Sequence, residues 1–207
     1  MDLGLLGGSF DPPHNAHIAI ARFVIERFAL DRVELVPAFR PPHKQSRPLS
    51  SPYHRYAMTA LAALDEPGLA ASDRELVRGG ISYAIDTLRE IRAARPESRI
   101  FFVLGSDQFA EVPTWREPDA IVREFELIVV RRSGSNLGES IGQAPFCVRE
   151  ARDAGRIRDG AMEPIDLSST AIRARVRAGQ PIEDLVNPRV AQYIDRYELY
   201  RSGGPHA

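Results

Sequence analysis

The sequence predicts a doubly wound α/β fold, with a parallel sheet covered by helices on both faces. Its apolar strands are continuous rather than alternating, as in residues 100–104, and this pattern is typical of strands buried on both faces. Segments with helical spacing separate these strands along the chain, which is the order that builds a parallel sheet. Ligands of such folds bind beyond the carboxyl ends of the strands.

The individual elements follow in chain order from the same patterns. Strands are expected at residues 3–6, 33–37, 69–72, 100–104, 127–130 and 146–148, and a further strand is expected to end near residue 166. Helices are expected at residues 16–28, 53–64, 82–94, 117–125 and 188–195, with one more that follows a cap at 168–170 and runs to about 178. The 207 residues are expected to form a single domain, with a core of about residues 1–132 and a C-terminal part of about residues 160–202.

Composition and charge narrow the class of protein. A net charge of −1, from 27 basic and 28 acidic residues, disfavours nucleic acid or an anionic membrane as the main partner. Cys147 is the single cysteine, which excludes an internal disulfide and fits a reducing compartment. There is no signal-peptide pattern, and no apolar run approaches the roughly 20 residues that cross a bilayer. A cytoplasmic protein is therefore expected, and assembly into a homo-oligomer stays open.

The first predicted strand runs into the segment GGSFDPPHNAH at residues 7–17, and a helix follows at once. Gly7 and Gly8 let the backbone approach a ligand closely. His14 and His17 stand where the helix begins, and a helix N-terminus with positioned N–H donors suits a phosphate. The same spacing occurs in zinc sites, although no third ligand stands nearby, and a histidine at this place can simply cap the helix. Together with the glycines, the segment favours contact with a nucleotide phosphate.

A second cluster stands before a predicted helix late in the chain, and it consists of Ser168, Ser169, Thr170 and Arg173. Three hydroxyls exceed what an ordinary N-cap needs, and Arg173 falls on the same helical face about one turn later. The cluster is either a plain cap or a pyrophosphate site built from N–H groups, hydroxyls and a guanidinium.

Five further residues suggest contacts to a nucleotide or to a second substrate. Gly105 ends a predicted strand, and the carboxylate of Asp107 can accept hydrogen bonds from ribose hydroxyls. Trp115, the only tryptophan, stands among polar residues, so stacking on a flat ring competes with ordinary core packing. Ser82 precedes a predicted helix, either as its N-cap or as a ligand contact. Lys44 is the only lysine among 27 basic residues, which favours a specific phosphate contact over chance.

With these motifs assembled, the chain resembles the bacterial nicotinate mononucleotide adenylyltransferases of the nucleotidyltransferase α/β phosphodiesterase superfamily. The superfamily signature is carried by HNAH at residues 14–17 and SSTAIR at residues 168–173. The narrower family is indicated by GGSFDPPH at 7–14, VP at 36–37, PPHK at 41–44, SY at 82–83, TL at 87–88, GSD at 105–107, PTW at 113–115 and RR at 131–132. The resemblance covers nearly the whole chain and implies a Rossmann-like nucleotidyltransferase fold with a small C-terminal helical extension.

The resemblance implies a reaction of ATP with nicotinate mononucleotide that gives deamido-NAD and pyrophosphate. Mg²⁺ is expected to arrive with ATP and to have few protein ligands, and Asp11 is expected to brace the glycine loop. The implied catalytic residues are His14, His17, Lys44 and Arg173. The implied ATP contacts are Gly7, Gly8, Ser9, Phe10, His14, His17, Gly105, Asp107, Ser168, Ser169, Thr170 and Arg173. The implied contacts to the second substrate are Lys44, Ser82, Tyr83, Trp115, Arg116 and Arg132.

The chain departs from the family pattern at three positions. Ala16 replaces a frequent glycine of the first motif, Ala84 removes a hydroxyl, and Arg116 stands where an aromatic residue is common. Two alternatives stay open: a sibling nucleotidyltransferase that uses nicotinamide mononucleotide or phosphopantetheine as acceptor, and a nucleotide-binding regulator without catalysis. Retention of both histidines, Lys44 and Arg173 disfavours the regulator.

Overall fold

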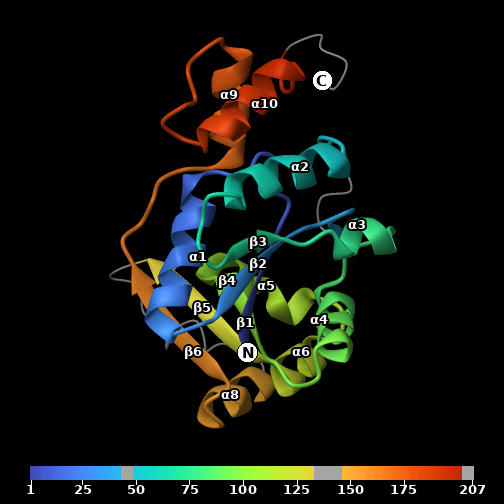
Figure 1. The fold of residues 1–207 in the computed structure, drawn as a ribbon. Helices are drawn as coiled ribbons and strands as arrows, with labels where there is room; N and C mark the ends of the chain where they lie inside the picture. The colour runs from blue at the N-terminus through green and yellow to red at the C-terminus, as the bar shows by residue number, and fades with distance from the viewer. Residues whose placement is uncertain (43–48, 133–145, 202–207) are drawn as a thin grey trace. The chain divides into compact units, whose positions relative to one another are not determined.

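The structure is a computed structural model that describes residues 1–42, 49–132 and 146–201. Six strands form one sheet in the order β3-β2-β1-β4-β5-β6 (Figure 1). Their bounds are β1 Asp2–Gly8, β2 Arg32–Pro37, β3 Leu69–Ala71, β4 Arg99–Gly105, β5 Glu126–Arg132 and β6 Ile157–Met162. The pairs β1–β4, β4–β5 and β5–β6 are parallel, so the predicted fold class is confirmed.

The helices alternate with the strands, as the sequence predicts. They are α1 Asn15–Phe28, α2 Pro52–Ala63, α3 Arg74–Arg78, α4 Ala84–Ala94, α5 Ser106–Glu111, the short 3₁₀ turn η2 Val112–Thr114, α6 Pro118–Glu124, α8 Phe146–Asp153, α9 Ser169–Arg177 and α10 Pro188–Arg196. Within the described parts of the chain, no helix is long and apolar enough to cross a membrane.

Contacts divide the chain into two compact units, which are described one at a time. The first unit comprises Met1–Gly7, Phe23–Glu34 and Tyr83–Pro164, and the second comprises Gly8–Arg22, Leu35–Ser82 and Ile165–Ala207. The single domain expected from the sequence stays a prediction.

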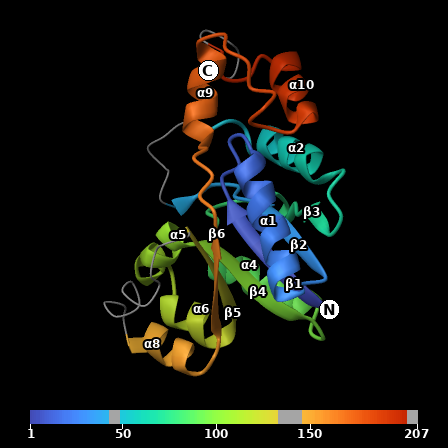
Figure 2. The same cartoon turned by 90° about the vertical axis from the view of Figure 1, so that its left-hand side faces the viewer.

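The first unit is built around the parallel strands β4, β5 and β6. The central residues of β4 and β5, such as Val103 and Ile128, are fully buried, which explains their continuous apolar sequence. The last turns of α1 lie on one side of these strands, and α6 and α8 lie on the other (Figure 2). Helices α4, α6 and α8 form a connected layer, because α6 packs against both of its neighbours.

The second unit pairs α2 with α10 and packs α2 on β3. Both helices begin with a proline in the first turn, after an N-cap side chain that accepts a backbone N–H: Ser51 for α2 and Asn187 for α10. Met58, Val190 and Ile194 are buried residues of these two helices. Of these two helices, α10 lies in the C-terminal part of the chain, where the resemblance implies a small helical extension.

Two predicted strands are wrong, and several elements of the structure were not predicted. Residues 146–148 begin the helix α8 instead of forming a strand, and their apolar character reflects one turn of an amphipathic helix with Val148 and Ala151 buried. No strand ends near residue 166: the last strand of the sheet, β6, ends at Met162 and was missed. The short helices α3 and α5 were not predicted, since five or six residues carry too little periodicity.

Gly160 explains why β6 was missed. A Cβ at this position would lie 2.7 Å from Cε1 of Phe23 and 3.3 Å from Cε2 of Phe28, two rings carried by α1. The apolar cover of the strand therefore comes from α1 and not from the side chains of β6, whose sequence IRDGAM shows no apolar run.

We expect Gly160→Val to lower the free energy of unfolding by about 1–3 kcal/mol, because the added atoms overlap two rings. Ala161→Val is the matched control: the next residue of the same strand is exposed, and the change should stay within about 0.5 kcal/mol. Urea unfolding monitored by circular dichroism measures both variants. Equal effects of the two substitutions would contradict the packing described here.

Candidate active site

Gly7 and Gly105, at the ends of the neighbouring strands β1 and β4, are not required by packing among the described residues. Apart from the adjacent residues, no described atom lies within 4 Å of the position that a Cβ at Gly7 would take, and at Gly105 the nearest is the Gln108 Oε1, at 3.9 Å. Gly8 differs, because a Cβ there would lie 3.1 Å from the ring of Phe10. Gly7 and Gly105 thus leave space at the carboxyl ends of two parallel strands, where ligands of doubly wound folds bind.

The predicted histidine pair forms one stacked unit at the start of α1. The rings of His14 and His17 have centroids 3.8 Å apart with an interplanar angle of 31°, and the ring of Phe10 packs edge-to-face with that of His17, with centroids 4.9 Å apart. The backbone N–H of His14 donates to Nδ1 of His17 at 3.2 Å. Since Nδ1 accepts, a neutral His17 carries its proton on Nε2 and presents an N–H donor there.

His14 is the more deeply buried of the pair, with 6% of its surface exposed. Burial lowers its pKa from 6.5 to about 4, so the ring is neutral at pH 7. Its Nδ1 is buried and has no hydrogen-bond partner among the described residues. The described chain contains no group of three or more His, Cys, Asp or Glu side chains that is arranged to hold a metal ion.

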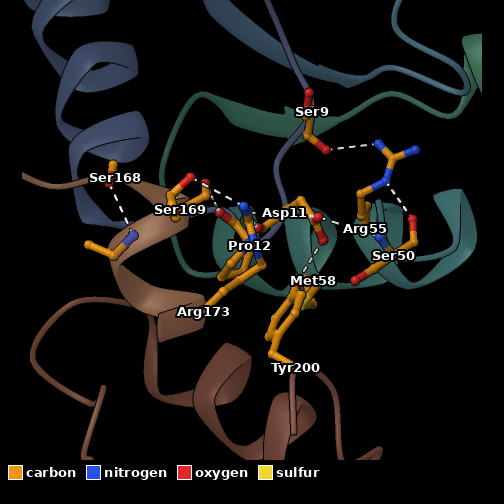
Figure 3. Close-up of polar contacts among 12 residues, drawn as sticks. Ser9, Asp11, Pro12, Ser50, Arg55, Met58, Ser168, Ser169, Arg173 and Tyr200 are labelled. Atoms are coloured by element: carbon orange, nitrogen blue, oxygen red, sulfur yellow. Dashed lines mark hydrogen bonds and ion pairs between the residues drawn. The ribbon is translucent and has the colours of Figure 1, made fainter. Parts of the chain in front are cut away.

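The glycine loop, residues 8–14, is held from α2 by a buried arginine that the sequence analysis missed. Arg55 is 1% exposed and donates to the carbonyls of Ser9 at 2.8 Å and Ser50 at 2.9 Å (Figure 3). It also donates to the carbonyl of Phe39 at 3.0 Å. Burial lowers the pKa of its guanidinium, and the nearby Asp11 charge opposes that effect. An arginine on the apolar face of a predicted helix, one turn before Met58, was the available signal.

The second predicted motif lies directly on this loop. Ser169 donates its hydroxyl to the carbonyl of Pro12 at 2.8 Å, and Nη1 of Arg173 donates to the carbonyl of Asp11 at 2.6 Å (Figure 3). Nη2 of Arg173 also donates to the Thr170 hydroxyl at 3.2 Å. The structure therefore joins the second motif directly to the loop that precedes the first, and the resemblance implies ATP contacts for both motifs. Some hydroxyls of this cluster thus have structural roles, in line with the alternative of a plain helix cap.

Ser168 is the N-cap of α9, since its hydroxyl accepts the N–H of Ala171 at 3.2 Å. Asp11 braces the loop, as expected. Its carboxylate is 2% exposed and accepts from the Tyr200 hydroxyl at 2.8 Å and from the Ser50 N–H at 3.4 Å.

Ser82 is not the N-cap of α4, which begins two residues later after Tyr83. Its hydroxyl accepts the N–H groups of Phe39 at 2.9 Å and Arg40 at 3.4 Å, and its own N–H donates to the carbonyl of Arg40 at 2.9 Å. Ser82 therefore fixes the segment that leads towards Lys44. Lys44 itself lies outside the described residues.

The remaining predicted contacts lie in the first unit. Asp107 is exposed in the first turn of α5, so it follows the strand within a helix and not in a turn. Trp115 packs on Phe102 with ring centroids 6.0 Å apart, and its buried Nε1 has no partner among the described residues. Arg116 lies over the Tyr83 ring at 4.8 Å and pairs with Asp86 at 3.5 Å. Arg132 is the last residue of β5.

Comparison with known proteins finds matches that include both motifs. Residues 5–175 match a family model described as cytidylyltransferase-like. A protein of Citrifermentans bemidjiense, named "Probable nicotinate-nucleotide adenylyltransferase", is 41% identical over 97% of this chain and 98% of its own. A protein of the same name from Salinibacter ruber is 37% identical over 97% and 98%. The chain belongs to the nicotinate-nucleotide adenylyltransferase family.

A solved structure supports the same fold. The nicotinic acid mononucleotide adenylyltransferase of Plasmodium falciparum superposes with a TM-score of 0.74 at 20% identity, and the match covers 96% of this chain and 97% of that one. Like its relatives, this nicotinate-nucleotide adenylyltransferase family member is a nucleotidyltransferase of NAD biosynthesis.

We expect the folding stability contributed by His14 to depend on pH. Well above pH 6.5, His14 is neutral in both the folded and the unfolded protein, and its contribution to stability is fully present. As the pH falls from 6.5 towards about 4, His14 takes up a proton in the unfolded chain but not in the folded protein. Stability is then lost over this window, by up to about 3 kcal/mol at 1.4 kcal/mol per pH unit. Denaturant titrations across this pH window measure the free energy of unfolding of wild type and of His14→Asn. The dependence of this free energy on pH should be weaker in the variant. An equal pH slope in both proteins would contradict the lowered pKa.

Proposed function

We propose that this chain transfers the adenylyl group of ATP to nicotinate mononucleotide, giving deamido-NAD and pyrophosphate. The observation that carries the proposal is the direct bonding of Ser169 and Arg173 to the glycine loop, which ends at His14 and leads into the helix that carries His17. Through this contact, the N-termini of α1 and α9 and the imidazoles of His14 and His17 lie around one loop of the second unit. Helix N-termini and N–H donors bind phosphate, so the arrangement favours binding of a triphosphate. The names of the relatives supply the acceptor.

Catalysis rests on positioning and on charge neutralisation. The phosphate of the mononucleotide is already an anion near pH 7, so its attack in line on the α-phosphorus needs no general base. We assign to His17 an N–H donor at Nε2, and to neutral His14 a second donor, for oxygens whose negative charge grows in the transition state. Lys44 and Arg173 add positive charge for the reacting phosphate and the departing pyrophosphate. Mg²⁺ enters as part of the MgATP substrate.

The remaining assignments concern the two nucleosides. Asp107 accepts from the ribose of adenosine, and the open positions beside Gly7 and Gly105 let ATP approach the strand ends. Trp115 stacks on the pyridine ring. The nicotinate carboxylate is bound near Tyr83, Arg116 and Arg132, while Ser82 contributes by holding the segment at residues 39–40. We further propose a cytoplasmic enzyme that has no nucleic-acid partner.

An anionic carboxylate is favoured by N–H and guanidinium donors, whereas a carboxamide is a weaker acceptor and brings donors of its own. We therefore expect a preference for nicotinate mononucleotide over nicotinamide mononucleotide. Pyrophosphate release with ATP and a panel of acceptors, including phosphopantetheine, measures kcat/KM for each. Equal efficiency with the amide, or a preference for phosphopantetheine, would refute the proposed acceptor, and no release with any acceptor would support a regulator.

His17→Ala removes a proposed transition-state donor and should lower kcat by roughly 10²–10³-fold while the protein stays folded. His54→Ala is the matched control, since His54 lies on α2 of the same unit, where it contacts Tyr193 and Tyr197. Its kcat should stay within about twofold of wild type. Pyrophosphate release and circular dichroism follow activity and folding. A fully active His17→Ala protein would remove the catalytic role.

A further inference from the structure

Tyr200 connects the C-terminal end of the described chain to the glycine loop. Its hydroxyl donates to Oδ1 of Asp11 at 2.8 Å and lies 4.0 Å from Sδ of Met58 (Figure 3). Tyr200 is 7% exposed, and the carboxylate that it reaches is 2% exposed. The contact joins residues 189 positions apart in the sequence, and no motif in the sequence pointed to it.

The backbone at Tyr200 adopts an unusual conformation. Its φ is +67°, in the left-handed region that a bulky residue rarely adopts. The preceding residue, Leu199, is fully buried and donates its N–H to the carbonyl of Ile194 at 3.0 Å. The chain thus ends its last helical turn with a tight reversal that directs the phenol towards Asp11.

The phenol is an obligatory hydrogen-bond donor at this place. Burial, together with the negative charge of Asp11, raises the pKa of Tyr200 well above 10, so the hydroxyl keeps its proton. Oδ2 of Asp11 receives the N–H of Ser50 at 3.4 Å and faces Nη1 of Arg173 at 3.9 Å. The Tyr200 contact at 2.8 Å is the shortest of the three. A buried carboxylate that loses its best donor moves towards water or towards another donor.

Movement of Asp11 would reach the histidines through a short path. Asp11 is followed by Pro12, Pro13 and His14, and Arg173 and Ser169 hold the carbonyls of residues 11 and 12. Prolines have a fixed φ, so a displaced Asp11 transmits its shift along the loop instead of absorbing it.

We propose that Tyr200 is a positioning residue for the reaction, whose hydroxyl fixes Asp11 and thereby the orientation of His14 and His17. The expected effect on kcat rests on the proposed function. The expected effect on the position of the glycine loop rests on the structure alone.

Tyr200→Phe removes only the hydroxyl and keeps the ring. We expect kcat to fall about tenfold, with the KM for both substrates within about twofold, because misplaced groups weaken the transition state more than ground-state binding. Tyr197→Phe is the matched control: its side chain lies in the same C-terminal segment against His54 and Tyr193 and is 47% exposed. Its kcat and KM should match wild type. Activity is measured well below each melting temperature, with folding checked by circular dichroism.

A second readout does not depend on turnover. In an NMR titration of the imidazole signals, assigned with a His14→Gln protein, Tyr200→Phe should raise the pKa of His14 by about one unit as the loosened loop admits water. Tyr197→Phe should leave it unchanged. A double-mutant cycle completes the test: if Asp11 and Tyr200 act as one unit, Tyr200→Phe added to Asp11→Asn should cause no further loss of kcat.

The outcomes separate the two proposals. An unchanged kcat and an unchanged His14 titration in Tyr200→Phe would overturn the positioning role, as would a loss of kcat that merely follows the unfolded fraction. A wild-type protein inactive with every acceptor would refute the proposed function, and the His14 titration would then still decide whether Tyr200 holds the loop.

Discussion

The buried carboxylate of Asp11 is the constraint on which the rest of the site depends. A carboxylate with 2% exposure is tolerated only when donors surround it, because an isolated buried charge is costly by several kcal/mol. Its donors come from distant parts of the sequence, as the contacts with Ser50, Arg173 and Tyr200 show. The hydrogen bonds and the ion pair of Asp11 therefore form only when the glycine loop, α9 and the C-terminal turn of the second unit lie together.

That arrangement has a functional consequence. The loop ends at His14, which stacks on His17 in the first turn of α1, while Arg55 of α2 holds the loop at the carbonyl of Ser9. An enzyme that needs no general base gains most from donors that are already in position before the substrate binds. In the first unit, the glycines at the ends of β1 and β4 serve the opposite need, since their missing side chains leave the strand ends accessible.

Much of this was predictable from the sequence, and the exceptions have physical causes. Buried parallel strands such as β4 and β5 identify themselves by continuous apolar residues, and the two phosphate motifs by their spacing. Strand β6 was missed because Phe23 and Phe28 of α1 cover Gly160 and replace its own side chains. For Ser82 the sequence suggested an N-cap or a ligand contact, because its position just before α4 does not reveal its bonds to Phe39 and Arg40. The partners of Asp11 are long-range contacts, which local patterns do not encode.

The most direct test of the account is a crystal structure of the protein with a non-hydrolysable ATP analogue. The account predicts phosphate oxygens within hydrogen-bond distance of Nε2 of His17, with the bonds of Asp11 to Tyr200 and of Arg173 to the loop unchanged. A triphosphate bound away from this loop, or bound only after those contacts break, would contradict it.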